Sequence, residues 1–457
     1  MTDGPGGARR LTFPLRSADI SRKTASVRKG MVVRILCTLA LSPSNARALL
    51  PLARAAAEAG HEVTVVSPPE MAGVFEGERI RVLPLFTDMA EIVLSLLQQK
   101  RIDFVPADPF SAQTLLATAC GPHVTDAYRQ LLDVAEEFKP DVIVRSGVEF
   151  AGYLVAETLG VPHVTAPSGG GQYLDPRLAF DELNLRRAEL GLPEGTAPEA
   201  IHAHGRFDCM PPEYTFTAHD IAGTFAYQQP ATIVRTETGP EWLREIPGDK
   251  PLVVVSSTNV FASLMHSAVF PRILDLFFDG MVAGHLFEGM DDVRADPAAV
   301  VHALMPGDAN PLTTIVKGLS QLDCTAVVAT RGMPVDPDAI GGNVRVFDTI
   351  PQPLLLETAQ LLFTHGGYNS VREAVRAGVP MAVLPELSDQ AHNATRVAEL
   401  GLGLRVPSAK ADDVAETVDR LLSDPSHAHA ARTAQRHMLA LPPVTAAVDH
   451  LVALAGH

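Results

Sequence analysis

Apolar residues recur along the chain in short runs that alternate with amphipathic stretches. From Val32 the run VVRILCTLAL is followed by a helical stretch from about Asn45 to Ala59, a stop at Gly60 and a second apolar run, HEVTVVSP. The same order returns in TDAYRQLLDVAEEFKP, DVIVRS, EFAGYLVAETLG and HVTAPS. Strands and helices that alternate in this way predict a parallel sheet covered by helices on both faces.

A second set of strands and helices begins after a segment rich in Pro, Gly and charged residues. This segment, residues 236–250, precedes the apolar run LVVVSS and is predicted to link two domains. Beyond it the runs TAVVATRG, QLLFTHGG and PMAVLP alternate with helical stretches. The sequence therefore predicts an α/β protein with two doubly wound domains, residues 31–235 and 251–440. A helix is expected over residues 441–457, and its return to the first domain is one option.

Composition and charge narrow the classes of protein and partner. With 457 residues, 46% of them hydrophobic and 20% charged, the chain is too long for one ordinary core and is typical of a two-domain globular protein. Its formal net charge is −16, and its body lacks a dense Lys/Arg block. Nucleic acid and an anionic membrane are therefore disfavoured as partners, and an anionic ligand would need local recognition by backbone groups.

The cysteines and the first residues of the chain bear on its compartment. The cysteines lie far apart in apolar surroundings, so neither a metal site nor a disulfide framework is expected. No apolar run reaches about 18 residues and no secretion signal is recognised, so we expect a cytoplasmic protein without a membrane span. Residues 1–30 mix basic residues with Gly, Ser and Thr and are predicted to form a disordered tail. The four cysteines are Cys37, Cys120, Cys209 and Cys324.

The candidate chemistry lies in residues 350–403, IPQPLLLETAQLLFTHGGYNSVREAVRAGVPMAVLPELSDQAHNATRVAELGLG. The strand LLFT ends in an HGG triplet, where two glycines let the backbone approach a ligand closely. The next helix is predicted to open at Asn369 and Ser370, and a helix N-terminus presents N–H groups and a positive dipole end to a diphosphate. A structural interpretation competes, in which Asn369 or Ser370 is the N-cap and Glu373 closes a capping box.

The whole segment resembles the donor-binding signature of family 1 nucleotide-sugar glycosyltransferases. The elements P-Q, H-G-G, N-S-x-x-E, G-V-P and P-x-x-x-D-Q-x-x-N-A occur here in that order. The resemblance, in particular to bacterial natural-product enzymes of the antibiotic and macrolide type, implies the GT-B fold with two facing Rossmann-like domains. It also implies an inverting, metal-independent transfer of a (deoxy)sugar from a dTDP- or UDP-sugar to a small acceptor. The nucleotide sugar would be a co-substrate, and no cofactor is expected.

Carried over to this sequence, the resemblance gives each stretch of the segment a part in donor binding. Residues 349–352 would line the nucleobase and ribose, the HGG triplet and the Asn-Ser pair would hold the diphosphate, and Glu373 would bind the ribose hydroxyls. The Asp-Gln pair of the motif would bind hydroxyls of the transferred sugar. A smaller match after the strand LVVVSS adds one hydroxyl. The implied donor-binding residues are Thr258, Thr349, Ile350, Gln352, His365, Gly366, Gly367, Asn369, Ser370, Glu373, Asp389 and Gln390.

The family's usual catalytic base is missing. Where related enzymes have a histidine after the first strand, this chain has Asn45, and an amide has no useful basicity. Asn45 is more simply interpreted as a helix N-cap. Candidate substitutes are Glu149, which is preferred because strand-end loops face the cleft, and His163. The structural interpretation of Glu149 is a surface carboxylate at a helix start. That of His163 is a packed strand histidine.

Several features are given no catalytic part. The triplet Gly169-Gly170-Gly171 lacks P-loop and G-x-G-x-x-G spacing and is interpreted as a flexible acceptor-side loop. His202 and His204 have no carboxylate at metal-ligand spacing, so no metal site is expected there. An insertion at about residues 262–312 is interpreted as an extra helical hairpin, with a cap over the cleft, an oligomer contact and simple packing all left open.

Three functions remain at this stage. The leading hypothesis is a glycosyltransferase acting on a small natural-product acceptor. The absent histidine favours the second, a catalytically silent homologue that binds a nucleotide sugar or serves as an auxiliary partner. The third, a nucleotide-sugar epimerase, is disfavoured by the DQ-x-x-NA motif. The sequence leaves open the sugar, the choice between uracil and thymine, the type of glycosidic bond and whether the chain forms a homodimer.

Overall fold

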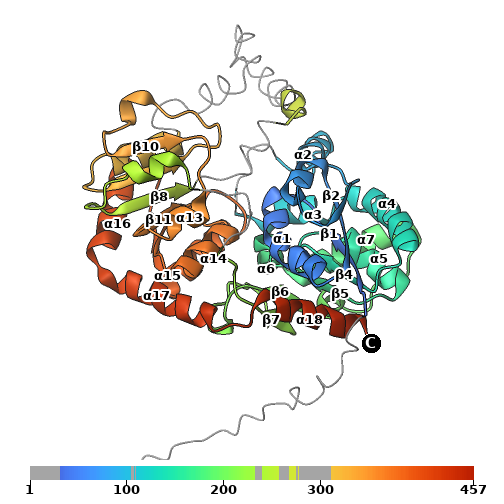
Figure 1. Cartoon of the computed structure of the whole chain (residues 1–457). Coiled ribbons are helices and arrows are strands. Elements are labelled where there is room, and N and C mark those ends of the chain that lie inside the picture. Colours follow the sequence, from blue (N-terminus) through green and yellow to red (C-terminus); the bar gives the residue numbers. More distant parts are fainter. Residues whose placement is uncertain are drawn as a thin grey trace, which may run out of the picture. The chain divides into compact units, whose positions relative to one another are not determined.

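The computed structural model describes residues 31–103, 108, 110–231, 239–256, 267–273, 276 and 310–456. From Val33 onward these residues belong to one compact unit. Its framework is a pair of parallel sheets, each accompanied by helices (Figure 1). The predicted α/β class with two doubly wound sheets is confirmed.

The first sheet has seven strands in the order β3-β2-β1-β4-β5-β6-β7, all parallel. The strand order reverses between β1 and β4, and ligands in such folds bind beyond the carboxyl ends of the two strands at this point. The strands are β1 (Arg34–Thr38), β2 (Glu62–Ser67), β3 (Arg81–Pro84), β4 (Val142–Arg145), β5 (His163–Thr165), β6 (Arg206–Asp208) and β7 (Thr224–Ala226).

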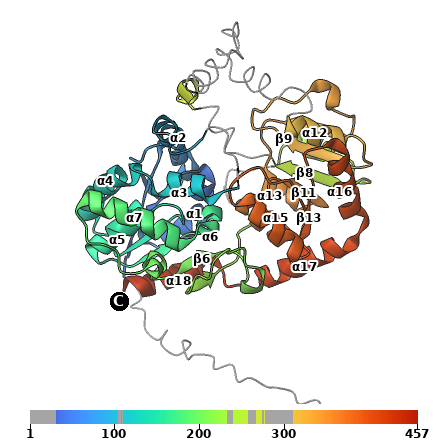
Figure 2. The same ribbon diagram turned by 180° about the vertical axis from the view of Figure 1, so that it is seen from behind.

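Helices join these strands and cover both faces of the sheet. Figure 2 shows α4, α5 and α7 lying together. The helices are α1 (Pro43–Glu58), η1 (Pro69–Phe75), α2 (Met89–Gln98), α3 (Ala112–Cys120), α4 (His123–Phe138), α5 (Ala151–Leu159), α6 (Gly169–Tyr173), α7 (Pro176–Leu190), η2 (Pro198–His202) and η3 (Pro212–Tyr214).

Successive residues of a strand enter opposite cores. In β1, Ile35 and Cys37 pack with residues of α1 and α18 (Val444–Ala455), whereas Leu36 packs with residues of α4 and α5. A sheet buried on both faces needs such continuous apolar strands, which explains why VVRILCTLAL reads as a run rather than as an alternating pattern.

The second sheet has six parallel strands in the order β10-β9-β8-β11-β12-β13. Its strand order reverses between β8 and β11, so the HGG triplet that follows β11 lies at the expected ligand-binding edge. The strands are β8 (Leu252–Ser256), β9 (Thr325–Ala329), β10 (Val344–Phe347), β11 (Leu361–Thr364), β12 (Met381–Val383) and β13 (Gly403–Arg405).

Helices also cover both faces of this second sheet. In β8, Leu252 and Val254 pack with residues of α14 and α17, while Val253 and Val255 pack with residues of α12 and α16. The helices are η4 (Glu241–Glu245), α12 (Pro311–Leu319), η6 (Pro337–Ala339), α13 (Gln352–Leu356), α14 (Tyr368–Ala377), α15 (Gln390–Glu399), α16 (Ala411–Ser423) and α17 (Pro425–Leu439).

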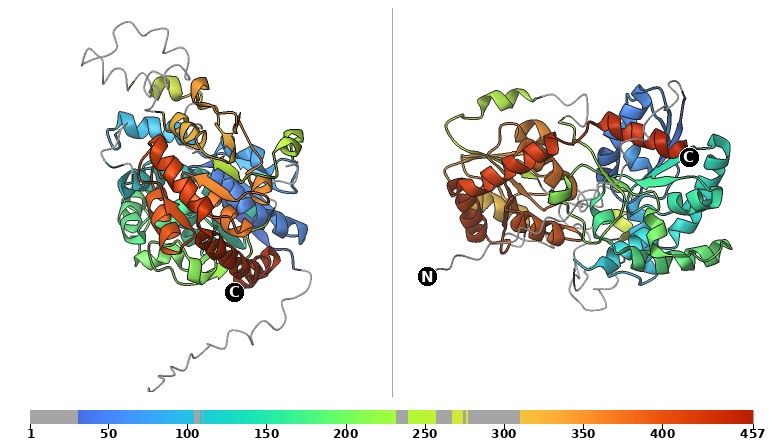
Figure 3. Two further views of the ribbon diagram at one scale, coloured as in Figure 1. Left: turned by 90° about the vertical axis from the view of Figure 1, so that its left-hand side faces the viewer. Right: turned by 90° about the horizontal axis from the view of Figure 1, so that it is seen from below.

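The last helix, α18, packs against elements of the first sheet. It follows α17 directly, and Figure 3 shows the two red helices in succession. Its residues Val448 and Leu451 belong to the same apolar core as Leu49 of α1 and Val144 of β4. Among the described helices none alone is long and apolar enough to cross a membrane, and only α17 and α18 together, bent by 46°, meet a test of length and composition.

Much of the predicted insertion lies outside the described residues, as do the predicted tail at residues 1–30 and Thr258. Of the insertion, residues 267–273, 276 and 310–312 are described, and Val269 and Ile273 pack against Ala90 and Leu94 of α2. All four cysteines are buried and free, as the sequence predicts.

Candidate active site

The HGG triplet forms the turn between β11 and α14. Gly366 has φ +88°, and a Cβ built on it would lie 2.7 Å from Cγ1 of Val383, so glycine is needed here. The helix begins at Tyr368, and its N-cap, Gly367, provides no side-chain cap. The first turn of α14 therefore directs uncapped N–H groups toward the carboxyl edge of the sheet.

The predicted capping box is wrong. It required Asn369 or Ser370 as the N-cap and Glu373 at the third helical position. Because the turn at residues 366–367 starts the helix earlier, Asn369 and Ser370 both lie inside its first turn. Their side chains make other contacts, and the N-cap of the helix provides no side-chain hydrogen bond to the N–H groups of this turn.

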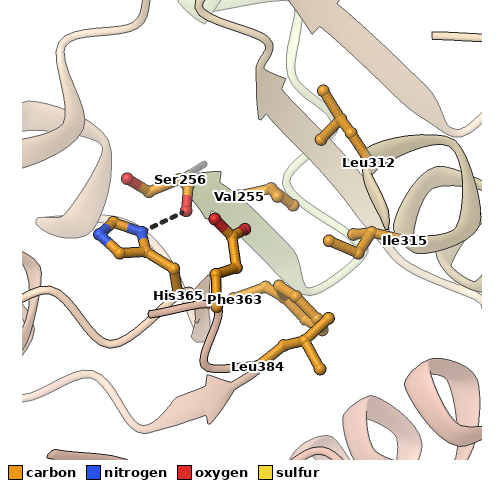
Figure 4. A pocket seen from close by; sticks show the side chains of 8 residues that line it. Val255, Ser256, Leu312, Ile315, Phe363, His365 and Leu384 are labelled. Carbon is orange, nitrogen blue, oxygen red and sulfur yellow. Dashed lines mark hydrogen bonds between the residues drawn. The ribbon is translucent and has the colours of Figure 1, made fainter. Parts of the chain in front are cut away.

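His365 lies beside the end of β8 (Figure 4). Its Nδ1 is 3.3 Å from the backbone carbonyl oxygen of Ser256, to which it donates. Burial lowers the pKa of His365 to about 4, so the ring is neutral at pH 7. Its Nε2 lies 2.4 Å from the position that a Cβ on Gly367 would occupy, which places this nitrogen at the N-terminus of α14. Nε2 of His365 and the N-terminus of α14 therefore lie next to each other at the carboxyl edge of the sheet.

A small cavity adjoins His365. It has a volume of about 300 Å³ including its open side. Sequence analysis missed one of its residues, Glu386, whose pKa burial raises to about 7. The sequence offers no signal for it beyond its place in the motif P-x-x-x-D-Q. The cavity is lined by Val255, Ser256, Leu312, Ile315, Phe363, His365, Leu384 and Glu386 (Figure 4).

Gln352 and Glu373, predicted to contact the nucleoside, lie together with Ser370, which was predicted to hold the diphosphate. Nε2 of Gln352 donates to Oε2 of Glu373 at 2.7 Å and to Oγ of Ser370 at 3.3 Å. Nη2 of Arg47, in α1, lies 4.0 Å from Oε1 of Glu373. Gln352 opens α13, whereas Ser370 and Glu373 lie in the first and second turns of α14, so two neighbouring helices build this polar group.

Thr349 and Ile350, which were also predicted to line the nucleobase, differ in burial. Thr349 is exposed, whereas the side chain of Ile350 is buried in the core of the second sheet. Only the backbone of Ile350 is therefore available to a ligand. An apolar residue that directly follows an exposed loop is a core anchor by its hydrophobicity, which the motif resemblance alone did not reveal.

The Asp-Gln pair of the motif is held rigidly at the start of α15. Oε1 of Gln390 accepts hydrogen bonds from the backbone N–H groups of Glu386 (2.8 Å) and Leu387 (3.1 Å), which fixes the orientation of its side-chain amide. Oδ2 of Asp389 accepts from Nδ2 of Asn393 at 2.8 Å. Burial raises the pKa of Asp389 to about 6.

The glycine triplet is not a flexible loop, as the sequence suggested, but the short helix α6. A Cβ on Gly171 would lie 2.5 Å from Cα of Gly147, and one on Gly170 would lie 2.9 Å from Cγ1 of Val148. A Cβ on Gly169 would lie 2.4 Å from Oδ2 of Asp389. The triplet therefore serves close packing, and it places the β4–α5 loop on one side of α6 and Asp389 on the other.

Asn45 is not the N-cap of α1, contrary to the structural interpretation of the sequence. The cap is Ser42, which accepts from the backbone N–H of Ser44. Asn45 lies within the first turn, is 8% exposed, and donates from Nδ2 to the carbonyl of Ala40. The proline at position 43 starts the helix two residues earlier than the apolar pattern indicated.

Glu149 is buried rather than exposed at a helix start. Its carboxylate accepts hydrogen bonds from Oγ1 of Thr38 and from the backbone N–H of Gly152, at 3.0 and 3.1 Å. Burial raises its pKa. His163, the other candidate base, is buried in β5 with its ring edge-on to Tyr153.

Glu149 lines a second cavity, at the carboxyl edge of the first sheet. The cavity has a volume of about 340 Å³ including its open side. Sequence analysis missed His123 there, since a histidine in an amphipathic helix carries no distinguishing signal. The lining residues are Ala40, Phe86, Thr87, Ile92, Ala119, His123, Val124, Ala127, Val148, Glu149, Phe150 and Ala151.

A buried hydrogen bond connects the first residue of α14 to β6. The hydroxyl of Tyr368 donates to Oδ1 of Asp208 at 2.5 Å. The same carboxylate also pairs with Arg206 through Oδ2. This contact, too, was missed, because its partners are 160 residues apart.

Within the described ranges no group of three or more His, Cys, Asp or Glu side chains is placed to hold a metal ion.

Comparison with known proteins identifies the family. Residues 313–454 match the family described as "Erythromycin biosynthesis protein CIII-like, C-terminal domain". The chain is 35% identical over 316 residues to NDP-glycosyltransferase YjiC of Bacillus subtilis, an alignment that covers 65% of this chain and 68% of that protein. The chain belongs to the NDP-glycosyltransferases. This glycosyltransferase is also 25% identical over 447 residues to aclacinomycin-T 2-deoxy-L-fucose transferase of Streptomyces galilaeus, covering 90% of this chain and 93% of that one.

Solved structures confirm the fold of the glycosyltransferase. The crystal structure of the glycosyltransferase VinC in complex with dTDP matches it with a TM-score of 0.63 at 20% identity, over 93% of this chain and 99% of that chain. The predicted GT-B fold is therefore confirmed. The predicted enzyme class is confirmed by the relatives named above.

Proposed function

We propose that this glycosyltransferase moves a (deoxy)sugar from a dTDP- or UDP-sugar to a small natural-product acceptor, by a single displacement that inverts C1. The donor binds at the HGG turn and α14, and the acceptor binds at the carboxyl edge of the first sheet. The dTDP complex of VinC favours the thymine nucleotide. The observation that carries the proposal is the uncapped N-terminus of α14, faced by Nε2 of His365.

The leaving diphosphate is stabilised by backbone and imidazole groups. The first-turn N–H groups of α14 and the positive end of its dipole attract the phosphates, and they act on charge that grows as the bond to C1 breaks. His365 is neutral in the free protein, and an adjacent phosphate favours its charged form, which donates from both nitrogens. These groups supply the positive potential at the diphosphate, so the proposal includes no metal ion.

The nucleoside and the sugar are assigned to the polar groups on either side of this turn. Gln352, Ser370 and Glu373 form one hydrogen-bonded group suited to the ribose hydroxyls. Asp389 and the amide nitrogen of Gln390 are suited to the hydroxyls of the sugar. Glu149 belongs to the acceptor cavity in this proposal, and its carboxylate holds the start of α5.

A catalytically silent, donor-binding homologue is the alternative, and the amide at Asn45 favours it. The hydrogen bond from Asn45 to the carbonyl of Ala40 gives this amide a structural role. An amide also has no useful basicity. The two functions differ in one outcome, because both bind the nucleotide but only the enzyme releases it in the presence of an acceptor.

The test is a panel of dTDP- and UDP-sugars incubated with a library of phenols, amines and aminoglycosides, with nucleotide release followed over time. We expect acceptor-dependent release by the wild type, with and without EDTA, and its loss in His365→Ala. Matched controls are dTDP titrations of both proteins. Tight donor binding without release from any pair would support the silent homologue instead.

A further inference from the structure

A buried guanidinium group lies behind the first turn of α14. We propose, on the basis of the function proposed above, that Arg372 places an unbalanced positive charge beside the diphosphate site and that the donor's diphosphate is its counter-ion. Arg372 does not touch the ligand in this proposal. It acts through its charge and through Asn369, and it is therefore a positioning residue.

The fold places the guanidinium of Arg372 against the N-terminus of its own helix. Side chains of a helix lean toward its N-terminus, so a residue of the second turn covers the first turn. Accordingly, Cζ of Arg372 lies 5.2 Å from the ring centroid of Tyr368, and Nη2 donates to Oδ1 of Asn369. Tyr368 and Asn369 are the first two residues of α14. The charge therefore lies against the turn whose N–H groups are assigned to the diphosphate.

The charges around Arg372 do not cancel. The side chain is 2% exposed, and the groups that interact with it electrostatically are Cys209, Tyr227, Tyr368 and Asp208. Burial raises the pKa of the Cys209 thiol to about 11 and the pKa of both tyrosines well above the ordinary value, so these groups are neutral at pH 7. Asp208, the one carboxylate among the four, pairs with Arg206. Two guanidinium groups and one carboxylate leave one positive charge in excess.

The guanidinium is also incompletely hydrogen-bonded. In the part of the chain that the structure describes, Nε and Nη1 of Arg372 are buried and have no hydrogen-bond partner. The thiol of Cys209 lies close to the guanidinium, but a thiol is a weak acceptor. The carboxylate of Asp208 accepts from other donors, which are the hydroxyl of Tyr368, Nη2 of Arg206 and the backbone N–H groups of Cys209 and Met210.

A buried charge without a counter-ion destabilises a folded protein. The positive end of the dipole of α14 has the same sign as Arg372 and adds to this cost. An anion bound at the first turn of α14 offsets both, and the interaction is less screened in the protein interior than at the surface. The negative charge on the diphosphate grows as its bond to C1 breaks, so Arg372 favours departure of the nucleotide as well as donor binding.

Arg372 also orients the side chain of Asn369. A guanidinium only donates hydrogen bonds, so the atom of the Asn369 amide that faces it is the oxygen. The amide nitrogen then points the other way, toward the backbone carbonyl of Ser44 in α1, 2.8 Å away. One guanidinium thus fixes the direction of a polar group that the donor motif assigns to the diphosphate.

The first test varies the charge of the ligand. The Kd values of dTDP and dTMP are measured by isothermal titration for the wild type and for Arg372→Met. We expect the Kd of dTDP to rise about tenfold and that of dTMP less than threefold, because the loss of a charge affects the more highly charged ligand more. An equal rise for both nucleotides, or no change in either, overturns the proposal.

The matched control for the titration is Arg186→Met. Arg186 is 3% exposed, and its Nε and Nη1 likewise lack hydrogen-bond partners in the described structure. It lies on α7, whose apolar residues Ala179 and Leu183 pack in a core of the first sheet, and it pairs with Glu189. We expect Arg186→Met to bind dTDP as the wild type does. A loss of dTDP affinity as large as that in Arg372→Met overturns the proposal.

The second test is the stability of the protein without ligand, where a structural role and the proposed role differ in sign. We expect Arg372→Met and Arg372→Gln to unfold at a urea concentration equal to or above that of the wild type, because the excess charge is removed. A lower midpoint or loss of folding in both variants overturns the proposal. Wild type that fails to bind dTDP overturns the proposed function, whereas dTDP binding that Arg372→Met leaves unchanged overturns the role of Arg372 alone.

Discussion

The side-chain amide of Asn369 donates a hydrogen bond to the backbone carbonyl of Ser44, 2.8 Å away. The first turn of α14 therefore contacts the first turn of α1. Asn45, at the position where the sequence resemblance implies a catalytic histidine in related enzymes, directly follows the residue that makes this contact. A residue at this position is thus held close to the donor motif, and the amide of Asn45 is bound to Ala40 rather than free for catalysis.

Replacement of Asn369 by alanine is expected to weaken donor binding. The substitution removes the bond to Ser44 and a polar group of the proposed diphosphate site, so the Kd for dTDP should rise about tenfold, the equivalent of roughly 1.4 kcal/mol. Isothermal titration measures it. Asn343→Ala is the control, because Nδ2 of Asn343 donates to the backbone carbonyls of Leu319, Leu322 and Cys324, which lie outside the proposed donor site. Equal Kd values for the two variants would contradict the assignment.

Replacement of Gly169 by alanine is expected to affect the sugar and not the nucleotide. The new methyl group would displace the carboxylate of Asp389, whose Oδ2 lies 2.4 Å from its position. Cβ of Tyr368, at 3.0 Å, would have to move by only a few tenths of an ångström. We expect kcat/KM for the nucleotide sugar to fall at least tenfold while the Kd for dTDP changes less than twofold. Gly73→Ala is the control, since nothing lies within 4 Å of its added Cβ. A parallel loss of dTDP binding in Gly169→Ala would contradict the role of Asp389 in holding the sugar.

Glu386 is expected to lower the stability of the protein above neutral pH. Its folded pKa, about 7, exceeds the value of 4.5 for an unperturbed glutamate, so between these values the folded chain holds a proton that the unfolded chain has lost. This stabilising contribution is complete below pH 4.5 and is lost as pH rises through 7. Glu386→Gln should therefore exceed the wild type in free energy of unfolding by up to about 3 kcal/mol at pH 8.

Urea denaturation of both proteins at pH 5 and pH 8 checks this prediction. At pH 5 the two free energies of unfolding should nearly coincide, and the buried histidines titrate in both proteins, so their contributions cancel in the difference. A gap that is as large at pH 5 as at pH 8 would show that Glu386 acts through packing and not through its charge.

The contact between Tyr368 and Asp208 is expected to matter more for stability than an ordinary hydroxyl pair. Tyr368→Phe leaves a buried carboxylate with one donor fewer and should cost about 1.5–3 kcal/mol. Tyr128→Phe, which removes a neutral bond to Thr158 at 3.0 Å, should cost about 0.5–1.5 kcal/mol. Thermal unfolding of the two variants provides the measurement, and the reverse ranking would contradict the account of this contact.

The sheets and the HGG turn could be predicted because local sequence determines them. A strand buried on both faces must be apolar throughout, so DVIVRS and LVVVSS identify their strands without reference to distant residues. The HGG turn could be predicted from its glycines, because Gly366 adopts a positive φ that favours glycine. Two of the errors concern helix ends. Pro43 and Gly367 each started a helix before the residue that the apolar pattern indicated.

The parts of the site that could not be predicted depend on contacts between distant segments. Gly169 is small because Asp389 lies against it, and nothing near the triplet in sequence indicates this. The burial of Glu149 and of Glu386 likewise follows from the folded environment, and with it their raised pKa values. The periodicity of apolar residues indicates which side of a helix or strand is buried. It does not indicate which polar group of a distant segment contacts that side.

Sugar transfer itself is tested most directly by the mass of the acceptor. The protein is incubated with dTDP-glucose or dTDP-rhamnose and 4-methylumbelliferone, and the products are measured by mass spectrometry beside Asp389→Asn as the matched variant. The account predicts that the wild type adds the mass of one sugar residue to the acceptor and that Asp389→Asn binds dTDP but adds none. An acceptor of unchanged mass with every donor and acceptor of the panel, from a protein that binds dTDP, would contradict it.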